Sequence, residues 1–310
     1  MKNKFILKII SFTLAVIVFL FIPLHTYAIS ASIESAITEH ILKIMQKGTG
    51  VYVNVPILMY HHLDEEANSS TIITPETFES HIKALTDNGY VGISFEELGD
   101  YVENDDAELP EKPIIITFDD GYSSNYEIAY PILQKYGMKA TIFVIGILVG
   151  KDSYIDTDSG EYPIIPHFCY EQANEMIESG LISIQSHSYD MHRFEKYEKL
   201  LNREFRYGIL PLDNESEEEY IIRFKDDYML SKTEIETETQ TEVITYAYPH
   251  GKYTELSEIL LREMGVKITL TVNRGNNKII KGNPETLYLL NRYNISNIPS
   301  ERLLEILNPE

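Results

Sequence analysis

The chain has 310 residues, 48 of them acidic and 26 basic, which gives a formal net charge of −22 at pH 7. Proteins that bind a phosphate backbone need basic surfaces, so this balance argues against nucleic acid as a partner. Hydrophobic residues make up 44% and charged residues 24%, which excludes a long disordered or collagen-like chain. The single cysteine, Cys169, excludes an intramolecular disulfide, so the fold must depend on an ordinary hydrophobic core.

The sequence begins with the pattern of an export signal, at residues 1–28. Lysines come first, an almost unbroken apolar run follows, and Thr26-Tyr27-Ala28 resembles a cleavage site. The apolar run is shorter than the roughly 20 residues that a membrane-spanning helix needs. We therefore predict a cleaved signal peptide on a bacterial protein that is secreted or held at the cell surface. The alternative is an uncleaved N-terminal membrane anchor, which would then be the protein's contact with the membrane.

Residues 29–50 have helical spacing and predict a helical neck. Beyond them, short apolar runs alternate with helical patterns along residues 51–310. The runs are rich in β-branched residues, which indicates strands buried on both faces. They predict strands at residues 55–60, 114–118, 140–145, 181–185, 243–248 and 266–272.

Helix boundaries between these runs are also readable. Pro75 follows Thr74 at a first helical position, and Ser94 with Glu97 forms a capping box. Glycines mark the expected helix ends at positions 89, 137, 180 and 265. Strand–helix alternation predicts an α/β fold with a parallel sheet, closed like an irregular barrel in one catalytic domain over residues 51–310. Two acidic stretches, 213–219 and 234–242, predict a solvated helical face within a long insertion.

Polar residues cluster where the predicted strands end. The clusters are His61-His62-Leu63-Asp64, Asp119-Asp120-Gly121, residues 186–192 with two histidines, and Tyr248-Pro249-His250-Gly251. The carboxyl ends of parallel strands converge on one face, so we expect these side chains to meet there. One carboxylate and two imidazoles can hold a divalent metal with open positions for water and substrate, which favours hydrolysis. Each cluster alone also fits an ordinary turn, and only their conjunction favours an active site.

These residues carry a resemblance to a known family. Thr117-Phe118-Asp119-Asp120-Gly121 resembles the first motif of the polysaccharide deacetylases of carbohydrate esterase family four. His187-Ser188 resembles the start of the second motif, and His192 follows His187 by five positions rather than the more usual four. That longer spacing, and the segment Leu58-Met59-Tyr60-His61, resemble the branch that includes the exported poly-N-acetylglucosamine deacetylases. The resemblance extends from about residue 55 to residue 295 and implies an irregular (β/α) barrel of this type, with its active site at the strands' carboxyl ends.

The resemblance also implies a role for each matching residue. Asp120, His187 and His192 would bind a divalent metal, with zinc as the first choice, and Asp119 would be the general base. His61 would be the general acid, because alternation along the strand should turn His62 away. A backbone N–H in the turn of Tyr248, Pro249 and His250 would help to hold the oxyanion. His167, Asp64, Tyr122 and the His250 side chain are weaker candidates for the cleft wall.

The third motif departs from the family pattern. An arginine usually precedes its proline and an aromatic residue follows, whereas Ala247 and His250 occupy these neighbourhoods. What orients Asp119 is therefore open. Arg292 is a candidate, although a surface arginine is an equally good interpretation. The late Leu-x-x-His motif of other members is not evident.

The leading hypothesis is a metal-dependent hydrolase that removes N-acetyl groups from an N-acetylhexosamine polysaccharide. The substrate would be poly-N-acetylglucosamine, peptidoglycan glycan or a chitin-like chain. One alternative is an esterase that removes O-acetyl groups, as some relatives do on xylan. A second alternative is a carbohydrate-binding protein that no longer catalyses hydrolysis, since the third motif is altered.

Overall fold

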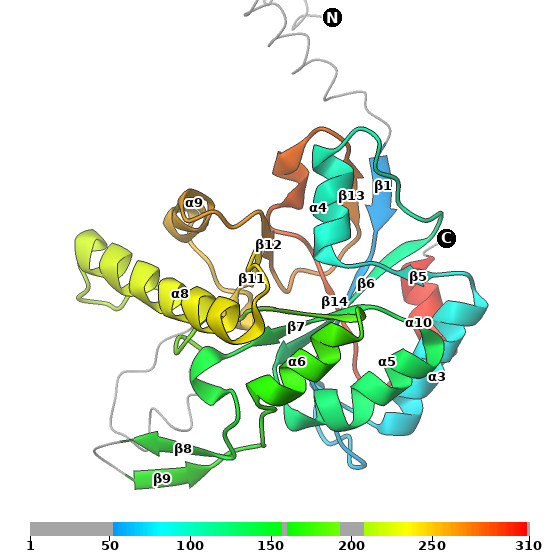
Figure 1. Cartoon of the computed structure of the whole chain (residues 1–310), viewed down its shortest axis with the longest axis horizontal. Helices are drawn as coiled ribbons and strands as arrows, with labels where there is room; N and C mark the ends of the chain where they lie inside the picture. Colours follow the sequence, from blue (N-terminus) through cyan, green and yellow to red (C-terminus); the bar gives the residue numbers. More distant parts are fainter. Residues whose placement is uncertain (1–51, 157–159, 193–207, 309–310) are drawn as a thin grey trace, which may run out of the picture. The chain divides into compact units, whose positions relative to one another are not determined.

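The computed structural model describes residues 52–308 apart from residues 157–159 and 193–207. Within these ranges, eight strands form the central sheet (Figure 1). In spatial order they are β12 (Ile268–Leu270), β11 (Thr245–Ala247), β10 (Ile182–Ser186), β7 (Ala140–Val144), β6 (Pro113–Asp120), β2 (Ile57–Tyr60) and β14 (Tyr293–Asn294), with β5 (Val91–Gly92) also paired to β6. The predicted signal peptide and helical neck lie outside the described residues.

The sheet is parallel and curled. Every neighbouring pair of its strands runs in the same direction. A bridge between Leu270 and Leu290 links β12 at one end to the segment just before β14 at the other. There the N–H of Leu290 donates to the Thr269 carbonyl at 2.8 Å, and the N–H of Thr271 donates to the Leu290 carbonyl at 2.9 Å. The predicted parallel barrel-like fold is confirmed, in the form of a curled half-barrel.

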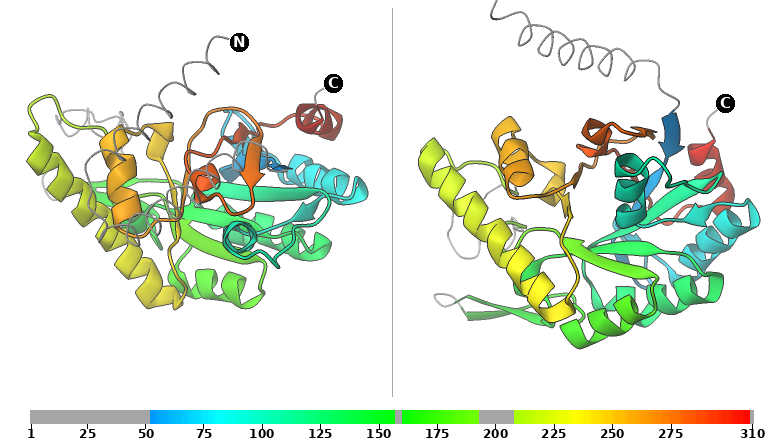
Figure 2. Two further views of the ribbon diagram at one scale, coloured as in Figure 1. Left: turned by 90° about the horizontal axis from the view of Figure 1, so that it is seen from above. Right: turned by 45° about the horizontal axis from the view of Figure 1, so that its top comes forward.

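Helices pack around the outside of this sheet (Figure 2). Thr74 caps α3 through its hydroxyl, and the predicted capping box of Ser94 and Glu97 opens α4. Gly137 ends α5 at φ 64°, a conformation that glycine adopts without steric cost. The helices are α3 (Pro75–Asp87), α4 (Phe95–Glu103), α5 (Tyr130–Tyr136), α6 (Tyr170–Glu178), α8 (Glu217–Thr239), α9 (Glu255–Glu263) and α10 (Ser300–Leu307).

Short elements complete the described chain. Three strand pairs stand apart from the main sheet: β1 (Tyr52–Val55) with β13 (Asn277–Ile280), β3 (His62–Leu63) with β4 (Ile72–Ile73), and β8 (Ser153–Asp156) with β9 (Gly160–Pro163). Short helical turns are η2 (Asn125–Ala129), η3 (Gly146–Leu148), η4 (Pro249–Gly251) and η5 (Pro284–Leu287). None of the helices in the described ranges combines the length and hydropathy needed to cross a bilayer.

Two predicted strands differ from the observed ones for clear reasons. The predicted strand 55–60 is divided at Pro56, which has no N–H to donate, and β1 pairs away from the main sheet. The strand predicted at 114–118 extends to Asp120, because pairing with β7 continues through Asp119 and Asp120. Both aspartates are therefore part of the strand and not of the loop after it.

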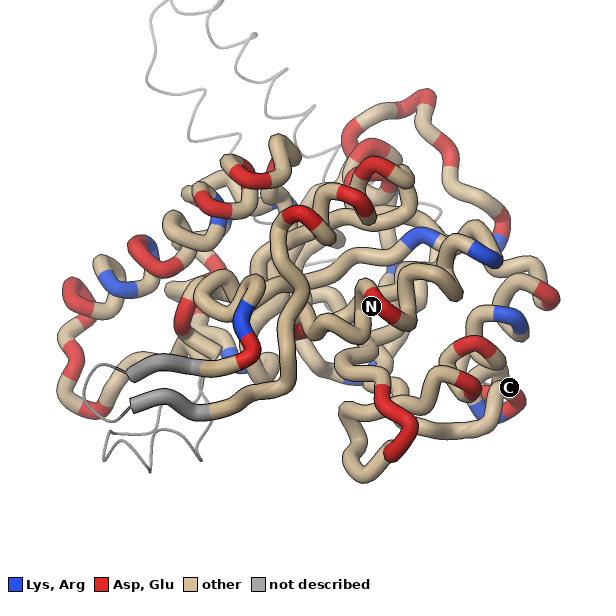
Figure 3. The backbone as a smooth tube through the Cα atoms, turned by 60° about the horizontal axis from the view of Figure 1, so that its bottom comes forward, with Lys and Arg blue, Asp and Glu red and all other residues tan. Residues whose placement is uncertain are grey.

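The long insertion contains α8. The predicted acidic stretches fall at or near its two ends, and acidic and basic residues alternate along the helix (Figure 3). Its buried side chains include Phe224 and Tyr228, whose rings lie 6.4 Å and 5.8 Å from the ring of Tyr246 on β11. The helix therefore has one apolar face on the sheet and one solvated face, as predicted.

Aromatic packing anchors the strands beneath the polar clusters. The ring of Tyr60, at the end of β2, lies 5.1 Å from Phe78 and 5.6 Å from Phe118 of β6. The Tyr60 hydroxyl also lies 3.1 Å from Nδ1 of His81, a fully buried histidine on α3. Burial of each such ring contributes roughly 1.5–3 kcal/mol. The ends of β2 and β6, and so His61 and Asp119, are held at fixed positions.

Candidate metal centre and active site

Asp119 and Asp120 end strand β6, where alternation sends neighbouring side chains in different directions. Both are buried, with exposed fractions of 2% and 4%. Asp120 has φ 78° and Gly121 has φ 86°, so the chain leaves the strand through two left-handed residues. A Cβ on Gly121 would lie only 3.0 Å from Cγ1 of Val144. Left-handed backbone at a non-glycine residue costs roughly 1–2 kcal/mol, and such strain concentrates at functional sites.

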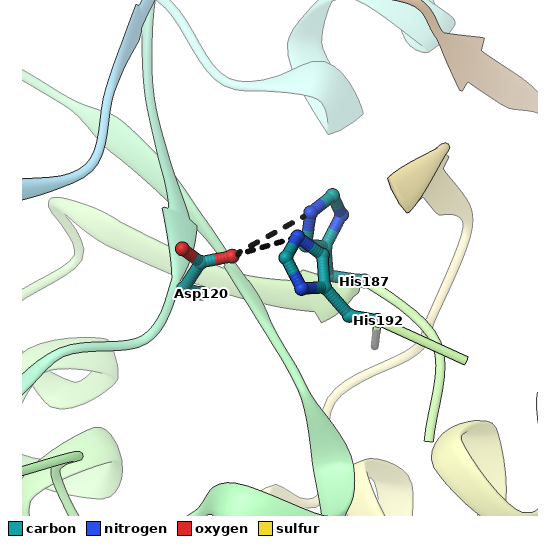
Figure 4. Close-up of side chains that lie close together, drawn as sticks. All are labelled: Asp120, His187 and His192. Atoms are coloured by element: carbon teal, nitrogen blue, oxygen red, sulfur yellow. Dashed lines mark ion pairs between the residues drawn. The ribbon is translucent and has the colours of Figure 1, made fainter. Parts of the chain in front are cut away.

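The two histidines of the second motif face Asp120 (Figure 4). His187 directly follows β10, and its Nδ1 lies 2.8 Å from the carbonyl of Ala247. A carbonyl can only accept, so Nδ1 carries the proton and Nε2 offers a lone pair. The Nε2 atoms of His187 and His192 lie 3.7 Å and 3.5 Å from Oδ1 of Asp120.

This cluster fits a divalent metal ion. One ligand atom from each of Asp120, His187 and His192 lies within 4.8 Å of the others, and no other such group is found in the described part of the chain. Oδ1 of Asp120 is buried and has no hydrogen-bond partner. A buried acceptor without a partner costs about 1–3 kcal/mol, which a bound cation would offset. One carboxylate oxygen and two imidazole nitrogens suit zinc and similar ions.

Burial keeps both imidazoles in the form that binds metals. It lowers the pKa of His187 to about 4, against the opposing effect of Asp119. It also lowers the pKa of His192 to about 3, with help from the neighbouring His250. Both rings are therefore neutral at pH 7, as metal ligation requires.

Asp119 is bound by Arg292, which is fully buried. The guanidinium donates from Nη1 to Oδ1 at 2.6 Å and from Nη2 to Oδ2 at 2.9 Å. Its Nε donates to the carbonyl of Thr271 at 2.8 Å, which fixes the plane of the fork. Burial alone would raise the pKa of Asp119, but the charge of Arg292 and the hydrogen bonds that it donates hold this pKa well below its usual range. The candidate arginine thus contacts Asp119 and does not lie on the surface.

His61 also lies near Asp119, with Nε2 at 4.0 Å from Oδ2. Its backbone carbonyl accepts a hydrogen bond from Nδ2 of Asn125 at 2.7 Å. Asn125 opens η2, a short π-helical turn, and π-turns are frequent at functional sites. This contact was not predicted from the sequence.

His62 points elsewhere, as strand alternation predicted. Its Nδ1 lies 2.8 Å from Oγ of Ser124, and its Nε2 lies 3.6 Å from Oδ2 of Asp64. Its ring lies 5.1 Å from Tyr122, which in turn lies 5.0 Å from the buried His167. His62, Tyr122 and His167 therefore form a separate group of tilted rings, outside the cluster of metal-type ligands.

The third motif forms the turn η4. His250 has φ 55° and places its ring 4.3 Å from that of His192. Tyr248 differs from its prediction: it is fully buried, its N–H donates to the Leu270 carbonyl, and its hydroxyl donates to Glu258 at 2.6 Å. Pro249 has no N–H. Neither Tyr248 nor Pro249 therefore offers a backbone N–H to an oxyanion.

Comparison with known proteins identifies the family. Residues 106–269, more than half of the chain, match the sequence profile described as Polysaccharide deacetylase. YxkH of Bacillus subtilis (strain 168), whose name as a polysaccharide deacetylase is provisional, is 32% identical over 242 residues, covering 78% of this chain and 71% of that protein. The poly-beta-1,6-N-acetyl-D-glucosamine N-deacetylase of Staphylococcus aureus (strain MRSA252) is 26% identical over 196 residues, covering 63% of this chain and 59% of its own length.

A solved structure agrees with these sequence matches. The deacetylase PplD of Streptococcus pyogenes, in complex with acetate, superposes with a TM-score of 0.63 at 26% identity. The match covers 84% of this chain and 100% of that one. The resemblance predicted from Asp119-Asp120-Gly121 and His187 is confirmed. The chain is an enzyme of the polysaccharide deacetylase family.

Proposed function

We propose that this enzyme is a metal-dependent N-deacetylase of an N-acetylhexosamine polysaccharide. The observation that carries the proposal is the convergence of three metal-type ligands, Asp120, His187 and His192, beside a carboxylate held by Arg292. The name of the Staphylococcus aureus relative, an N-deacetylase of poly-beta-1,6-N-acetyl-D-glucosamine, supports an N-acetylated polymer as substrate. Export to the cell surface, where such polymers are found, is part of the proposal.

The three ligands would hold a divalent ion, with zinc as the first choice because of the two imidazoles. When bound, the ion supplies Lewis-acid activation of the attacking water and of the acetyl carbonyl. The chain's own residues contribute position and proton transfer. His187 is oriented for this role by its Nδ1–H, which donates to Ala247.

Asp119 and His61 divide the proton transfers. Asp119 remains ionised at neutral pH, because its pKa is lowered, and takes the proton of the water that attacks the acetyl carbon. A backbone N–H of the turn η4 would help to hold the oxyanion that forms. As the C–N bond breaks, His61 in its protonated form donates a proton to the departing nitrogen. The products are acetate and a free amino sugar. Asp119 then releases its proton and His61 takes one up from solvent, which restores both groups for the next cycle.

Acetate release from two classes of substrate tests the proposal. Purified residues 29–310, loaded with zinc, are given β-1,6-linked N-acetylglucosamine oligomers and, separately, acetylated xylan. We expect release from the oligomers. We also expect H61Q to lower that rate by about 10²–10⁴-fold, because an amine leaves only when protonated, and H62Q to keep most of it.

Other results would contradict the proposal. Release from xylan alone, with little effect of H61Q, would identify an esterase, since an alcohol leaving group needs less protonation. Release from neither substrate would indicate a carbohydrate-binding protein without catalysis.

A further inference from the structure

One face of α8 contacts the segment that carries both histidines. Arg223, Asp227 and Ser231 are spaced four residues apart and therefore share a face of the helix. Nη1 of Arg223 lies 3.7 Å from Sδ of Met191, directly before His192. Oγ of Ser231 lies 2.8 Å from Oγ of Ser186, directly before His187. The insertion helix thus contacts both ends of this ligand segment, residues 186–192.

Asp227 binds the middle of the ligand segment. The N–H of Tyr189 donates to Oδ1 at 2.9 Å, and the N–H of Asp190 donates to Oδ2 at 2.7 Å. Each carboxylate oxygen accepts one backbone donor, and hydrogen bonds to an ionised acceptor are about twice as strong as neutral ones. The two amides lie between His187 and His192 in the sequence. A shift of this peptide would therefore move both imidazoles.

The opposite side of the segment is held by η3. The N–H of Gly146 donates to the carbonyl of Ser188, and the N–H of Ile147 donates to the carbonyl of Tyr189, both at 3.0 Å. A Cβ on Gly146 would lie 2.6 Å from Cδ2 of Tyr189, so the two segments are in close contact. Ser188 has φ 74°, a conformation that needs such support. The carbonyl groups of the ligand segment are thus bound by η3, and its N–H groups are bound by Asp227.

We propose that Asp227 is a positioning residue for the metal centre. From α8 it fixes the ligand segment so that the Nε2 atoms of His187 and His192 both face Oδ1 of Asp120. This inference rests on the proposed function in one respect, namely that these three residues bind the metal. The acidic insertion thus has a role in positioning the metal ligands, which its composition did not predict. Residues that orient metal ligands typically raise the affinity for the metal by about 10–100-fold.

Zinc affinity of the metal-free protein tests the proposal without any measurement of hydrolysis. D227N removes the charge with little change of shape, and D226N is the matched control, because Asp226 is the exposed neighbour on the same helix. We expect D227N to weaken zinc binding by about 10–100-fold in competition with a chromogenic chelator. D226N should bind as the wild type does. Thermal unfolding of each metal-free variant reports stability separately.

The outcomes are distinguishable. Wild-type affinity in folded D227N, with or without a lower Tm, would overturn the positioning role and leave the metal centre intact. Failure of the wild type itself to bind zinc or another divalent ion would overturn the proposed metal centre, and this inference with it. If D227N does not fold, D227E must still bind zinc more weakly than the wild type, because its longer side chain displaces the peptide. Equal affinity of D227E would then contradict the proposal.

Discussion

Asp119 and Arg292 form a buried ion pair, and its geometry determines the state of the candidate base. The two parallel hydrogen bonds hold the carboxylate ionised and fix its plane. Breaking a buried pair by removing one partner is strongly unfavourable, because the remaining charge has neither water nor a counter-ion. Arg292 therefore replaces the arginine that the third motif lacks, from a position far along the chain.

R292M tests this interpretation through stability. In the metal-free protein at pH 7, we expect the free energy of unfolding to fall by about 3–5 kcal/mol. The wild-type Asp119 has a lowered pKa, so its ionised form stabilises the fold above about pH 4, and this contribution is lost as the pH falls below that value. The difference between R292M and the wild type should therefore be largest above about pH 4 and shrink as the pH falls below that value.

Denaturant unfolding at several pH values measures this difference. R302M is the control, because Arg302 is 60% exposed in its pair with Glu305 and should contribute little. A deficit of R292M that is small, or that is independent of pH, would contradict a structural ion pair with an ionised Asp119.

At the scale of elements, helix α9 supports the turn η4. Glu258 on α9 is almost fully buried and accepts from the hydroxyl of Tyr248. It also accepts from Nε of Arg262 at 3.0 Å and from the hydroxyl of Thr269 on β12 at 3.1 Å. One carboxylate thus joins a helix, a strand and the turn that contains His250.

Y248F removes one donor from this carboxylate. We expect a loss of about 1–3 kcal/mol in the free energy of unfolding, because Oε2 of the buried Glu258 loses the donor that Tyr248 supplies, while Oε1 keeps Arg262 and Thr269. Acetate release should also fall, since the turn is less well fixed. Y253F is the control, because Tyr253 stacks on Tyr248 but is 37% exposed. Equal effects of the two variants on stability and rate would show that the Glu258 contact does not support the turn.

The sequence predicted the parts of the site that lie within one short segment. Asp119 and Asp120 end strand β6, and His187 and His192 lie in the segment that follows β10. These strand ends were visible in the apolar runs. Asn125, Asp227 and Glu258 were not predicted, because each acts through a contact between segments that are brought together only by the curled sheet. Tyr248 was misplaced for the same reason, since its buried partner lies on α9. Arg292 could be named as a candidate, but only the structure decides between core and surface.

At the scale of the whole molecule, the strong negative charge and the N-terminal signal pattern both agree with the proposed export. The described acidic residues are spread over helices and loops (Figure 3), which favours a solvated surface. We expect the mature protein to begin at Ile29. Intact-mass and N-terminal analysis of protein from the culture medium of a bacterial host measures this directly. A full-length N-terminus in the membrane fraction would indicate the uncleaved anchor instead.

We propose that hydrolysis requires a divalent ion bound at Asp120, His187 and His192. Zinc content and acetate release are therefore measured together on residues 29–310, before chelation, after chelation, and after zinc is restored. D120N is measured in parallel, because asparagine tolerates the left-handed backbone of Asp120 and removes only the charge. We expect one zinc per chain and activity that is lost and regained with the zinc, and we expect D120N to have neither. Full acetate release from the chelated enzyme or from D120N would contradict it.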